Sequence, residues 1–91
     1  MEIKFTKQAM DDIKSVMEFI GQDDILVVKK VSSKLKQNIN LLEKYPKLGI
    51  WDSETKSYEL VISKLPYVVS YEVKKEVIYI LTIMHTSRAI F

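Results

Sequence analysis

The apolar residues of this chain change their spacing once, between Tyr45 and Lys56. Before this segment most of them recur at intervals of three and four residues, and after it they alternate with polar residues. A period near 3.6 predicts amphipathic helices that bury one face, whereas a period of two predicts strands. The chain is therefore restricted to helices followed by strands, which is typical of an α+β domain.

The part of the chain before this change predicts a short strand and two helices. The segment EIKF alternates and is expected to form the strand, and Thr6 is suited to cap the helix that follows it. Gly21 and Pro46 are typical of helix ends, so each helix is expected to stop at or before one of them. The link between the helices is very short, which favours an antiparallel helical hairpin.

The part after the change predicts three strands. Residues 57–63 and 67–73 alternate, whereas residues 77–84 are almost continuously apolar, as in a strand that is buried on both faces. Lys74 and Lys75 are expected to form the turn before the last strand.

The predicted order of elements is β-α-α-β-β-β, with a loop over residues 46–57. This order predicts a single α+β domain, residues 1–91, in which a helical hairpin packs on one face of an antiparallel sheet. The residues that we expect to be largely buried are Val28, Val31, Leu35, Ile39, Leu60, Val69, Leu81 and Ile83.

The composition of the chain excludes or disfavours several classes of protein. The chain has 91 residues, a formal net charge of +2, no cysteine and one histidine. This composition excludes disulfides and thiolate metal sites and disfavours a zinc site, so we expect neither a metal nor a cofactor. No apolar run free of charges reaches the length of a membrane span, and the first ten residues carry charges where a signal peptide is apolar. We therefore expect a cytoplasmic protein.

Two residue types occur only in the last part of the sequence. His85 is the only histidine and Arg88 is the only arginine. Histidine titrates near neutral pH, and the arginine guanidinium matches the geometry of phosphate oxygens. Residues three apart in a strand point to opposite faces, so the pair shares a site only if the strand ends near Met84 and the chain curls. Taken alone, a structural strand end is the simpler interpretation of the pair.

Four segments together resemble the RelE/ParE superfamily, the toxins of bacterial type II toxin–antitoxin modules, which are also known as plasmid stabilisation proteins. In sequence order they are FTKQAMDDI, LLEKYPKLG, YELVISKLPYVVSYEV and VIYILTIMHTSR. The resemblance covers nearly the whole chain and implies the same order of elements. It also implies a growth-inhibiting toxin that a cognate antitoxin neutralises. RelE-like members cleave mRNA on the ribosome, and ParE-like members poison DNA gyrase.

The resemblance implies a ribonuclease site at the end of the last strand. In many ribonuclease members, residues at or beyond this strand end take part in catalysis. We therefore expect a metal-independent, ribosome-dependent mRNA endoribonuclease in which His85 moves a proton and Arg88 binds phosphate. Lysines would add positive charge, and aromatic rings would stack on a base. The residues expected to contact RNA are Lys56, Lys64, Tyr71 and Phe91.

Departures from the superfamily pattern leave other functions open. Tyr58 and Val68 stand where the superfamily often has arginine. The alternatives are a ParE-like gyrase poison without enzymatic activity and a degenerate toxin that only binds its antitoxin. Ile25, Leu26 and Val27 exceed what the apolar stripe of the second helix requires, which suggests a protein partner. Packing within the helical hairpin explains these three residues nearly as well.

Overall fold

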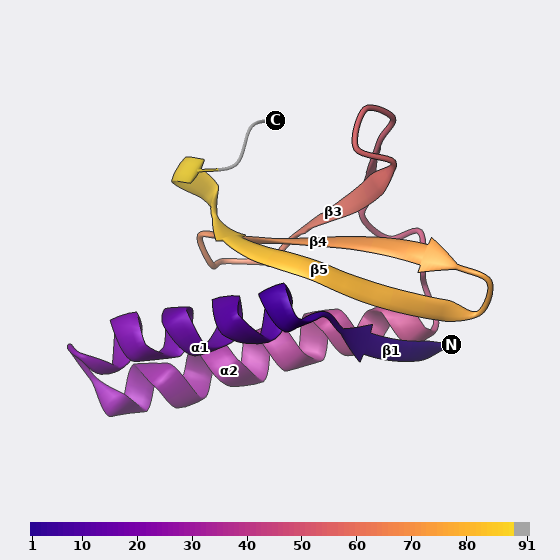
Figure 1. Cartoon of the computed structure of the whole chain (residues 1–91). Helices are drawn as coiled ribbons and strands as arrows, with labels where there is room; N and C mark the ends of the chain where they lie inside the picture. Colours follow the sequence, from indigo (N-terminus) through magenta and orange to yellow (C-terminus); the bar gives the residue numbers. More distant parts are fainter. Residues whose placement is uncertain (89–91) are drawn as a thin grey trace.

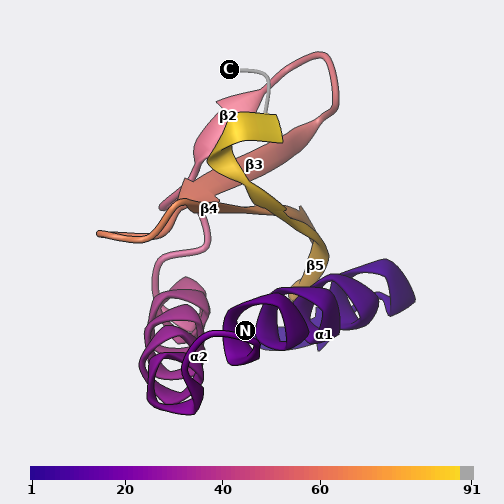
Figure 2. The ribbon, with the colours of Figure 1, turned by 90° about the vertical axis from the view of Figure 1, so that its left-hand side faces the viewer.

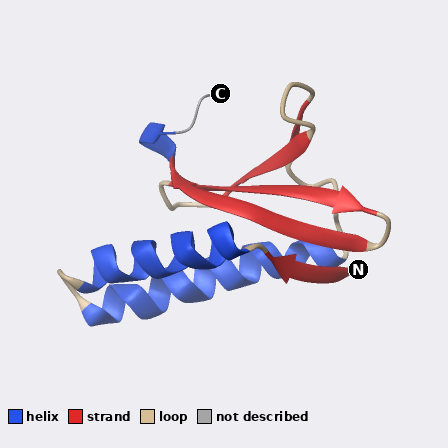
Figure 3. Ribbon diagram, viewed as in Figure 1, coloured by secondary structure: helices blue, strands red, loops and turns tan. Residues whose placement is uncertain are grey.

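In the computed structural model, two helices lie along one face of a five-stranded sheet (Figures 1 and 3). The structure describes residues 1–88, and the side chains of residues 1–87. The elements, in chain order, are β1 (Glu2–Phe5), α1 (Lys7–Gly21), α2 (Ile25–Asn40), the 3-10 turn η1 (Leu41–Glu43), β2 (Ile50–Asp52), β3 (Ser57–Val61), β4 (Tyr67–Lys74), β5 (Val77–His85) and the 3-10 turn η2 (Thr86–Arg88). The predicted α+β order is confirmed, with β2 as an additional short strand inside the predicted loop.

Short polar side chains determine where the two helices begin. Thr6 accepts a hydrogen bond from the N–H of Ala9 at 3.1 Å, and Asp24 accepts one from the N–H of Leu26 at 2.9 Å. These caps satisfy first-turn N–H groups that have no partner within the helix. The Thr6 hydroxyl also donates to the carbonyl of Leu81 at 3.0 Å, so the start of α1 is held on β5.

The strands lie in the order β1-β5-β4-β3-β2. β4 pairs antiparallel with β3 and β5, but β1 runs parallel to β5, from Glu2 beside Val77 to Phe5 beside Ile80. The prediction of a wholly antiparallel sheet is therefore wrong for β1. Tight turns enforce antiparallel pairing, and the helical hairpin, rather than a tight turn, follows β1. β5 lies between two strands, as its continuous apolar run predicted.

Three lysines occupy strained positions in the turns between strands. Lys56, Lys64 and Lys75 have φ angles of 55°, 63° and 57°, in the left-handed region. The Cβ atom of any residue other than glycine makes this region unfavourable by roughly 1 kcal/mol, and glycine or asparagine fills it more readily. The β4–β5 turn lies at Lys75 and Glu76, one residue later than predicted.

The core lies between the helices and the face of the sheet that they cover, while β2 and β3 rise away from the helices (Figure 2). The members of this core are Ala9, Val31, Leu35, Ile39, Leu42, Leu60, Ile62, Tyr67, Val69, Tyr71, Ile78, Ile80 and Ile83. Six of the eight residues predicted to be buried belong to it, and Val28 and Leu81 are half-buried. Leu81 is the extra residue of a β-bulge, which turns it out of the regular alternation.

Within the described part of the chain, the helices are shorter and more polar than a membrane span requires, so none of them could cross a membrane.

Candidate functional site

The last strand ends at His85, and the chain then curls into the single turn η2. The N–H of Thr86 donates to the carbonyl of Pro66 at 2.8 Å, which fixes this change of direction. The predicted curl is thus present, one residue later than expected. The side chain of Arg88 and the whole of Phe91 lie outside the described part, so their predicted roles stay predictions.

His85 is half-buried and packs against the neighbouring strand. It is the cross-strand partner of Tyr67, and the two rings meet edge to face with centroids 5.6 Å apart and planes at 84°. Nδ1 of His85 accepts a hydrogen bond from the N–H of Ser87 at 3.1 Å and lies 2.8 Å from the Ser87 hydroxyl oxygen. A main-chain N–H can only donate, so Nδ1 is unprotonated in this arrangement. The neutral ring therefore carries its proton on Nε2 and presents a donor to its surroundings.

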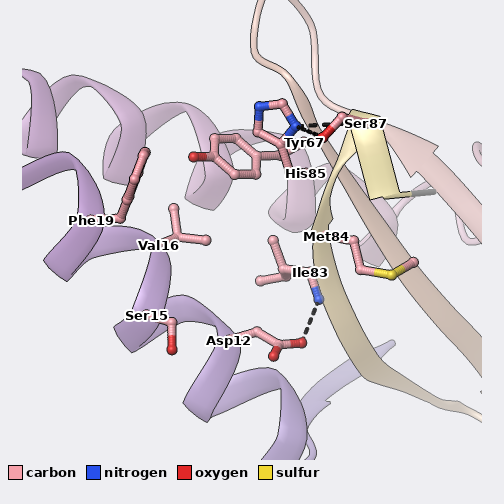
Figure 4. A pocket seen from close by; sticks show the side chains of 9 residues that line it. All are labelled: Asp12, Ser15, Val16, Phe19, Tyr67, Ile83, Met84, His85 and Ser87. Atoms are coloured by element: carbon pink, nitrogen blue, oxygen red, sulfur yellow. Dashed lines mark hydrogen bonds between the residues drawn. The ribbon is translucent and has the colours of Figure 1, made fainter.

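A groove of about 690 Å³ lies between α1 and the end of β5 (Figure 4). The residues that line it are Asp12, Ser15, Val16, Phe19, Tyr67, Ile83, Met84, His85 and Ser87. Asp12 is held at one end, because its carboxylate accepts hydrogen bonds from the side chain of Gln8 at 2.8 Å and from the main-chain N–H of Ile83 at 3.0 Å. No pattern of residues indicates this groove, because it depends on the packing of α1 against β5.

The lysines predicted to contact RNA lie at opposite ends of the sheet. Lys64 is in the β3–β4 turn, at the same end as His85, whereas Lys56 precedes β3. The first residues of β3 lie level with Ile80 of β5. Ile80 and His85 are five residues apart, which is about 16 Å along a strand. His85 and Lys56 therefore do not form one site.

Tyr71 is fully buried, which contradicts the prediction that it stacks on a base. Its hydroxyl donates to the carbonyl of Pro46 at 2.8 Å and accepts from the N–H of Gly49 at 2.9 Å. Its ring stacks on Tyr58, with centroids 5.2 Å apart. Desolvation by burial raises the pKa of Tyr71 above its ordinary value. The phenol therefore holds the loop before β2, and its role is structural.

Gly49 explains why the segment PKLG is compact. A Cβ at this position would lie 2.9 Å from the carbonyl oxygen of Glu59 and 3.0 Å from the hydroxyl of Tyr71. Only glycine allows the loop to come this close to β3 and β4. The segment that contributed to the family resemblance is thus a packing feature.

The glutamates and lysines on the strands of the sheet leave no lysine unpaired within the described residues. Glu59 and Glu72 lie on the face opposite the helices, because their neighbours along each strand belong to the core. Lys4 and Lys74 are the only lysines within the strands of the described chain, and they pair with Glu2 at 3.9 Å and with Glu72 at 3.3 Å. Over residues 1–87 the strands therefore do not offer a cluster of cations to RNA phosphates. Within the described residues, no group of three acidic or histidine side chains could hold a metal ion.

The tip of the helical hairpin is apolar and exposed. Phe19, Ile25, Leu26 and Val27 have exposed fractions of 67%, 68%, 62% and 40%. Packing between the helices does not cover these side chains, so that explanation of the surplus apolar residues is wrong. An exposed apolar cluster of this kind is typical of a protein-binding surface.

Comparisons with known proteins agree on one family. The family model described as the ParE toxin of the type II toxin-antitoxin system, parDE, matches residues 3–90. The chain is 30% identical over 87 residues to Toxin RelE2 of Caulobacter vibrioides, covering 96% of this chain and 97% of that protein. It also superposes on a chain of the chromosomal ParDE TA system from P. aeruginosa with a TM-score of 0.80, at 18% identity and covering 93% of this chain and 95% of that one. This last likeness concerns the fold.

Proposed function

This chain belongs to the ParE toxin family of type II toxin–antitoxin systems, and from that premise we propose that it stops growth by binding DNA gyrase rather than by cutting RNA. The observation that carries the proposal is the charge of the sheet. Glu59 and Glu72 occupy the face that the helices leave open, and both strand lysines of the described chain pair with glutamates. Because Glu72 is itself paired with Lys74, the strands present no cluster of unpaired cations to a phosphate backbone, and a surface of this kind suits contact with a protein.

The arrangement around His85 supports the same choice. Attack by a ribose 2′-hydroxyl needs a base, an acid and cations near the phosphate. Nδ1 of His85, the nitrogen of the neutral ring that could accept a proton, is engaged by Ser87 and therefore faces the chain's own groups rather than a ligand. Lys56 lies beyond the level of Ile80, which is itself about 16 Å along β5 from His85, so Lys56 is too far away to assist the ring, and Lys64 is the one predicted lysine at the same end of the sheet as His85.

Two assays with purified protein test the target. We expect the protein to inhibit supercoiling by purified DNA gyrase and to leave mRNA intact in cell-free translation. A catalytically inactive gyrase control establishes that any DNA cleavage comes from gyrase and not from the toxin. Cleavage of ribosome-bound mRNA, with gyrase unaffected, would show that the proposal is wrong.

The turn η2 favours one second candidate, an mRNA endoribonuclease. It takes Thr86–Arg88 out of the line of β5, which the predicted pairing of His85 with Arg88 requires. In this case His85→Ala should lower the rate of cleavage ~10²–10⁴-fold, the usual cost of losing a proton-transfer group. Under the gyrase proposal the wild-type protein shows no cleavage to lose.

A cognate antitoxin is the partner expected to neutralise the protein. The exposed cluster of Phe19, Ile25 and Leu26 offers apolar area for such a partner. Expression of the chain alone should stop bacterial growth, and co-expression of a small acidic protein encoded beside it should restore growth. Harmless expression at a high level would instead indicate a degenerate toxin that has kept only its antitoxin-binding role.

A further inference from the structure

β2 is the last strand of the described sheet, and the edge that faces away from β3 has no strand beside it (Figure 2). The main-chain groups of β3 show which residue of β2 is open. Ile62 donates its N–H to the carbonyl of Tyr67 at 3.0 Å, and the two lie opposite each other when the register of β3 and β4 is continued by one step. Pairs that exchange hydrogen bonds recur at every second residue, so Leu60 also bonds to β4, and Glu59 directs its N–H and C=O to β2.

The N–H and C=O of Trp51 therefore point to the open side. Ile50 lies opposite Glu59 and exchanges hydrogen bonds with it. Main-chain groups alternate in direction along a strand, so those of Trp51, the next residue, face away from β3. A donor and an acceptor on one residue can exchange two hydrogen bonds with the same residue of a second copy that is related by a two-fold axis.

The side chains at this edge are apolar and largely exposed. Natural edge strands usually carry a lysine, a proline or a bulge that prevents pairing with another chain, and β2 has none of these. Trp51 meets the ring of Tyr58 edge to face, with centroids 4.9 Å apart, so its ring is held in position. The exposed apolar side chains at the edge, with their exposed fractions, are Tyr45 (57%), Leu48 (47%), Ile50 (71%) and Trp51 (52%). We call these four residues the β2 surface.

The charges on the two sides of β2 have opposite signs. Lys44 and Lys47 precede the strand, whereas Asp52 ends it and Glu54 follows it. When two copies pair antiparallel, the residues before β2 in one copy lie beside the residues after β2 in the other. With the two Trp51 residues opposite each other, Lys47 lies next to the position opposite Glu54 of the second copy. Each copy thus supplies the charge that complements the other, and it does so on both sides of the axis.

The size of the β2 surface determines how tightly two copies can associate. An aromatic side chain buries about 150–250 Å², so four large side chains that are about half exposed offer roughly 400 Å² per copy. Two copies then bury roughly 800 Å², which is less than the about 1,200–2,000 Å² of stable interfaces. We therefore expect a weak dimer, with a dissociation constant of at least about 10 μM.

We propose that two copies of this chain associate through β2, antiparallel about a two-fold axis at Trp51, so that their sheets join into one sheet with five strands from each copy. The two Trp51 residues exchange main-chain hydrogen bonds, and the β2 surface is buried between the copies. The tip of the helical hairpin lies at the other end of α2, a helix of 16 residues or about 24 Å, so the antitoxin surface proposed above and the β2 surface are separate (Figure 1). The interface is independent of whether gyrase or RNA is the target.

Sedimentation velocity of the purified free protein, from about 5 μM to about 1 mM, tests the proposal. We expect the sedimentation coefficient to rise from that of a monomer toward that of a dimer across this range. Trp51 is the only tryptophan, so its fluorescence should shift to shorter wavelength over the same concentrations as the second copy covers the ring. A chain that stays monomeric throughout the range would overturn the proposal.

Exchange of two charges tests the two-fold arrangement. Lys47→Glu places like charges beside each other on both sides of the axis, and Glu54→Lys does the same with the opposite sign. Each single substitution should weaken association at least about fourfold, because a repulsion replaces an exposed ion pair twice. Lys47→Glu combined with Glu54→Lys should restore the affinity of the wild-type protein. A double variant that associates no better than the single variants would contradict the antiparallel pairing and overturn the proposal.

A matched pair of lysine substitutions locates the interface. Ile50→Lys places a charge within the open edge and should weaken association at least about tenfold without unfolding the protein, because this side chain is mostly exposed. Met10→Lys changes an apolar side chain of α1 that is 56% exposed and should leave association unchanged. Circular dichroism checks that both variants fold. Equal association of the two variants would overturn the proposal. Loss of gyrase inhibition by Ile50→Lys, in a protein that never dimerises, would assign the edge to gyrase instead.

Discussion

The carboxylate of Asp12 on α1 accepts a hydrogen bond from the main-chain N–H of Ile83 on β5, over a distance of 3.0 Å and 71 positions of sequence. This contact supplies the partner that a neighbouring strand would otherwise provide, because β1 has already ended at Phe5. It therefore connects the helical layer to the sheet at the point where the strand pairing stops.

Asp12→Ala should destabilise the protein because it leaves the Ile83 N–H without a partner. An unsatisfied main-chain donor in a half-buried position costs about 1–3 kcal/mol. Urea denaturation at neutral pH measures the change in the free energy of unfolding. Asp11→Ala removes an exposed carboxylate from the same helix and should change stability far less. Equal effects of the two substitutions would contradict the importance of the contact.

Tyr71→Phe should destabilise the protein because the loop before β2 then loses its two hydrogen bonds to the phenol. We expect a loss of about 1–3 kcal/mol in the free energy of unfolding, because the N–H of Gly49 is left unpaired. Tyr45→Phe, at a side chain that is 57% exposed, is the matched control and should be close to neutral. A fully stable Tyr71→Phe protein would mean that the loop holds its position by other contacts.

Alkaline pH should destabilise the wild-type protein through the same phenol. Burial raises the pKa of Tyr71 in the folded state, so above pH ~10 the unfolded chain releases this proton first. The free energy of unfolding is therefore undiminished below the unfolded pKa and decreases as the pH rises toward the folded pKa. Tyr71→Phe should remove this part of the pH dependence. The measurement is the difference in slope between the two proteins from pH 8 to pH 11 in urea denaturation.

Lys75→Gly should stabilise the protein, because it relieves the left-handed backbone of the β4–β5 turn. The expected gain is about 0.5–1 kcal/mol, offset in part by the greater freedom of glycine in the unfolded chain. Lys75→Ala removes the same charge but keeps Cβ, so it should give no gain. If alanine and glycine act alike at this position, charge rather than backbone strain explains the change.

Replacing both Ile25 and Leu26 with serine should weaken antitoxin binding and leave the fold intact. Both side chains are mostly exposed, so they add little to the stability of the isolated chain. Burial of one such side chain against a partner contributes about 1.5–3 kcal/mol, so affinity should fall at least tenfold. The variant compared with it carries Lys29→Ser and Lys30→Ser, which change two exposed side chains in the neighbouring turn of α2. Calorimetric titration with the antitoxin provides the comparison, and unchanged affinity would move the interface elsewhere.

Most of the fold, but only part of the candidate site, could be predicted from the sequence. The change of apolar period predicted the helices, the three long strands and the interior place of β5. It also placed Tyr71 on the same face as Val69, so the burial of Tyr71 was readable and its predicted contact with RNA was inconsistent with the pattern. β2 was missed because three residues, Ile50–Asp52, are too few to show alternation.

Other features depend on contacts between segments that are distant in the sequence, and the local spacing of apolar residues does not indicate these contacts. The contact of Tyr67 with His85 follows from the register of β4 and β5, which a bulge at Leu81 shifts by one residue. The parallel direction of β1 follows from the way the helical hairpin returns the chain to the sheet. The groove beside β5 depends on both, so its lining was not visible in the sequence.

The parallel pairing of β1 also determines the order in which the molecule assembles. Glu2 lies beside Val77, so this pairing joins residues that are 75 positions apart in the sequence (77 − 2), whereas β3, β4 and β5 meet through short turns. Loop closure costs more entropy for distant segments, so contacts between neighbours in sequence form sooner. We expect the antiparallel meander to be protected first in pulse-labelled hydrogen exchange during refolding, and β1 to be protected last. Early protection of residues 3–5 would contradict this order. The first strand to be synthesised is then the last to join the sheet.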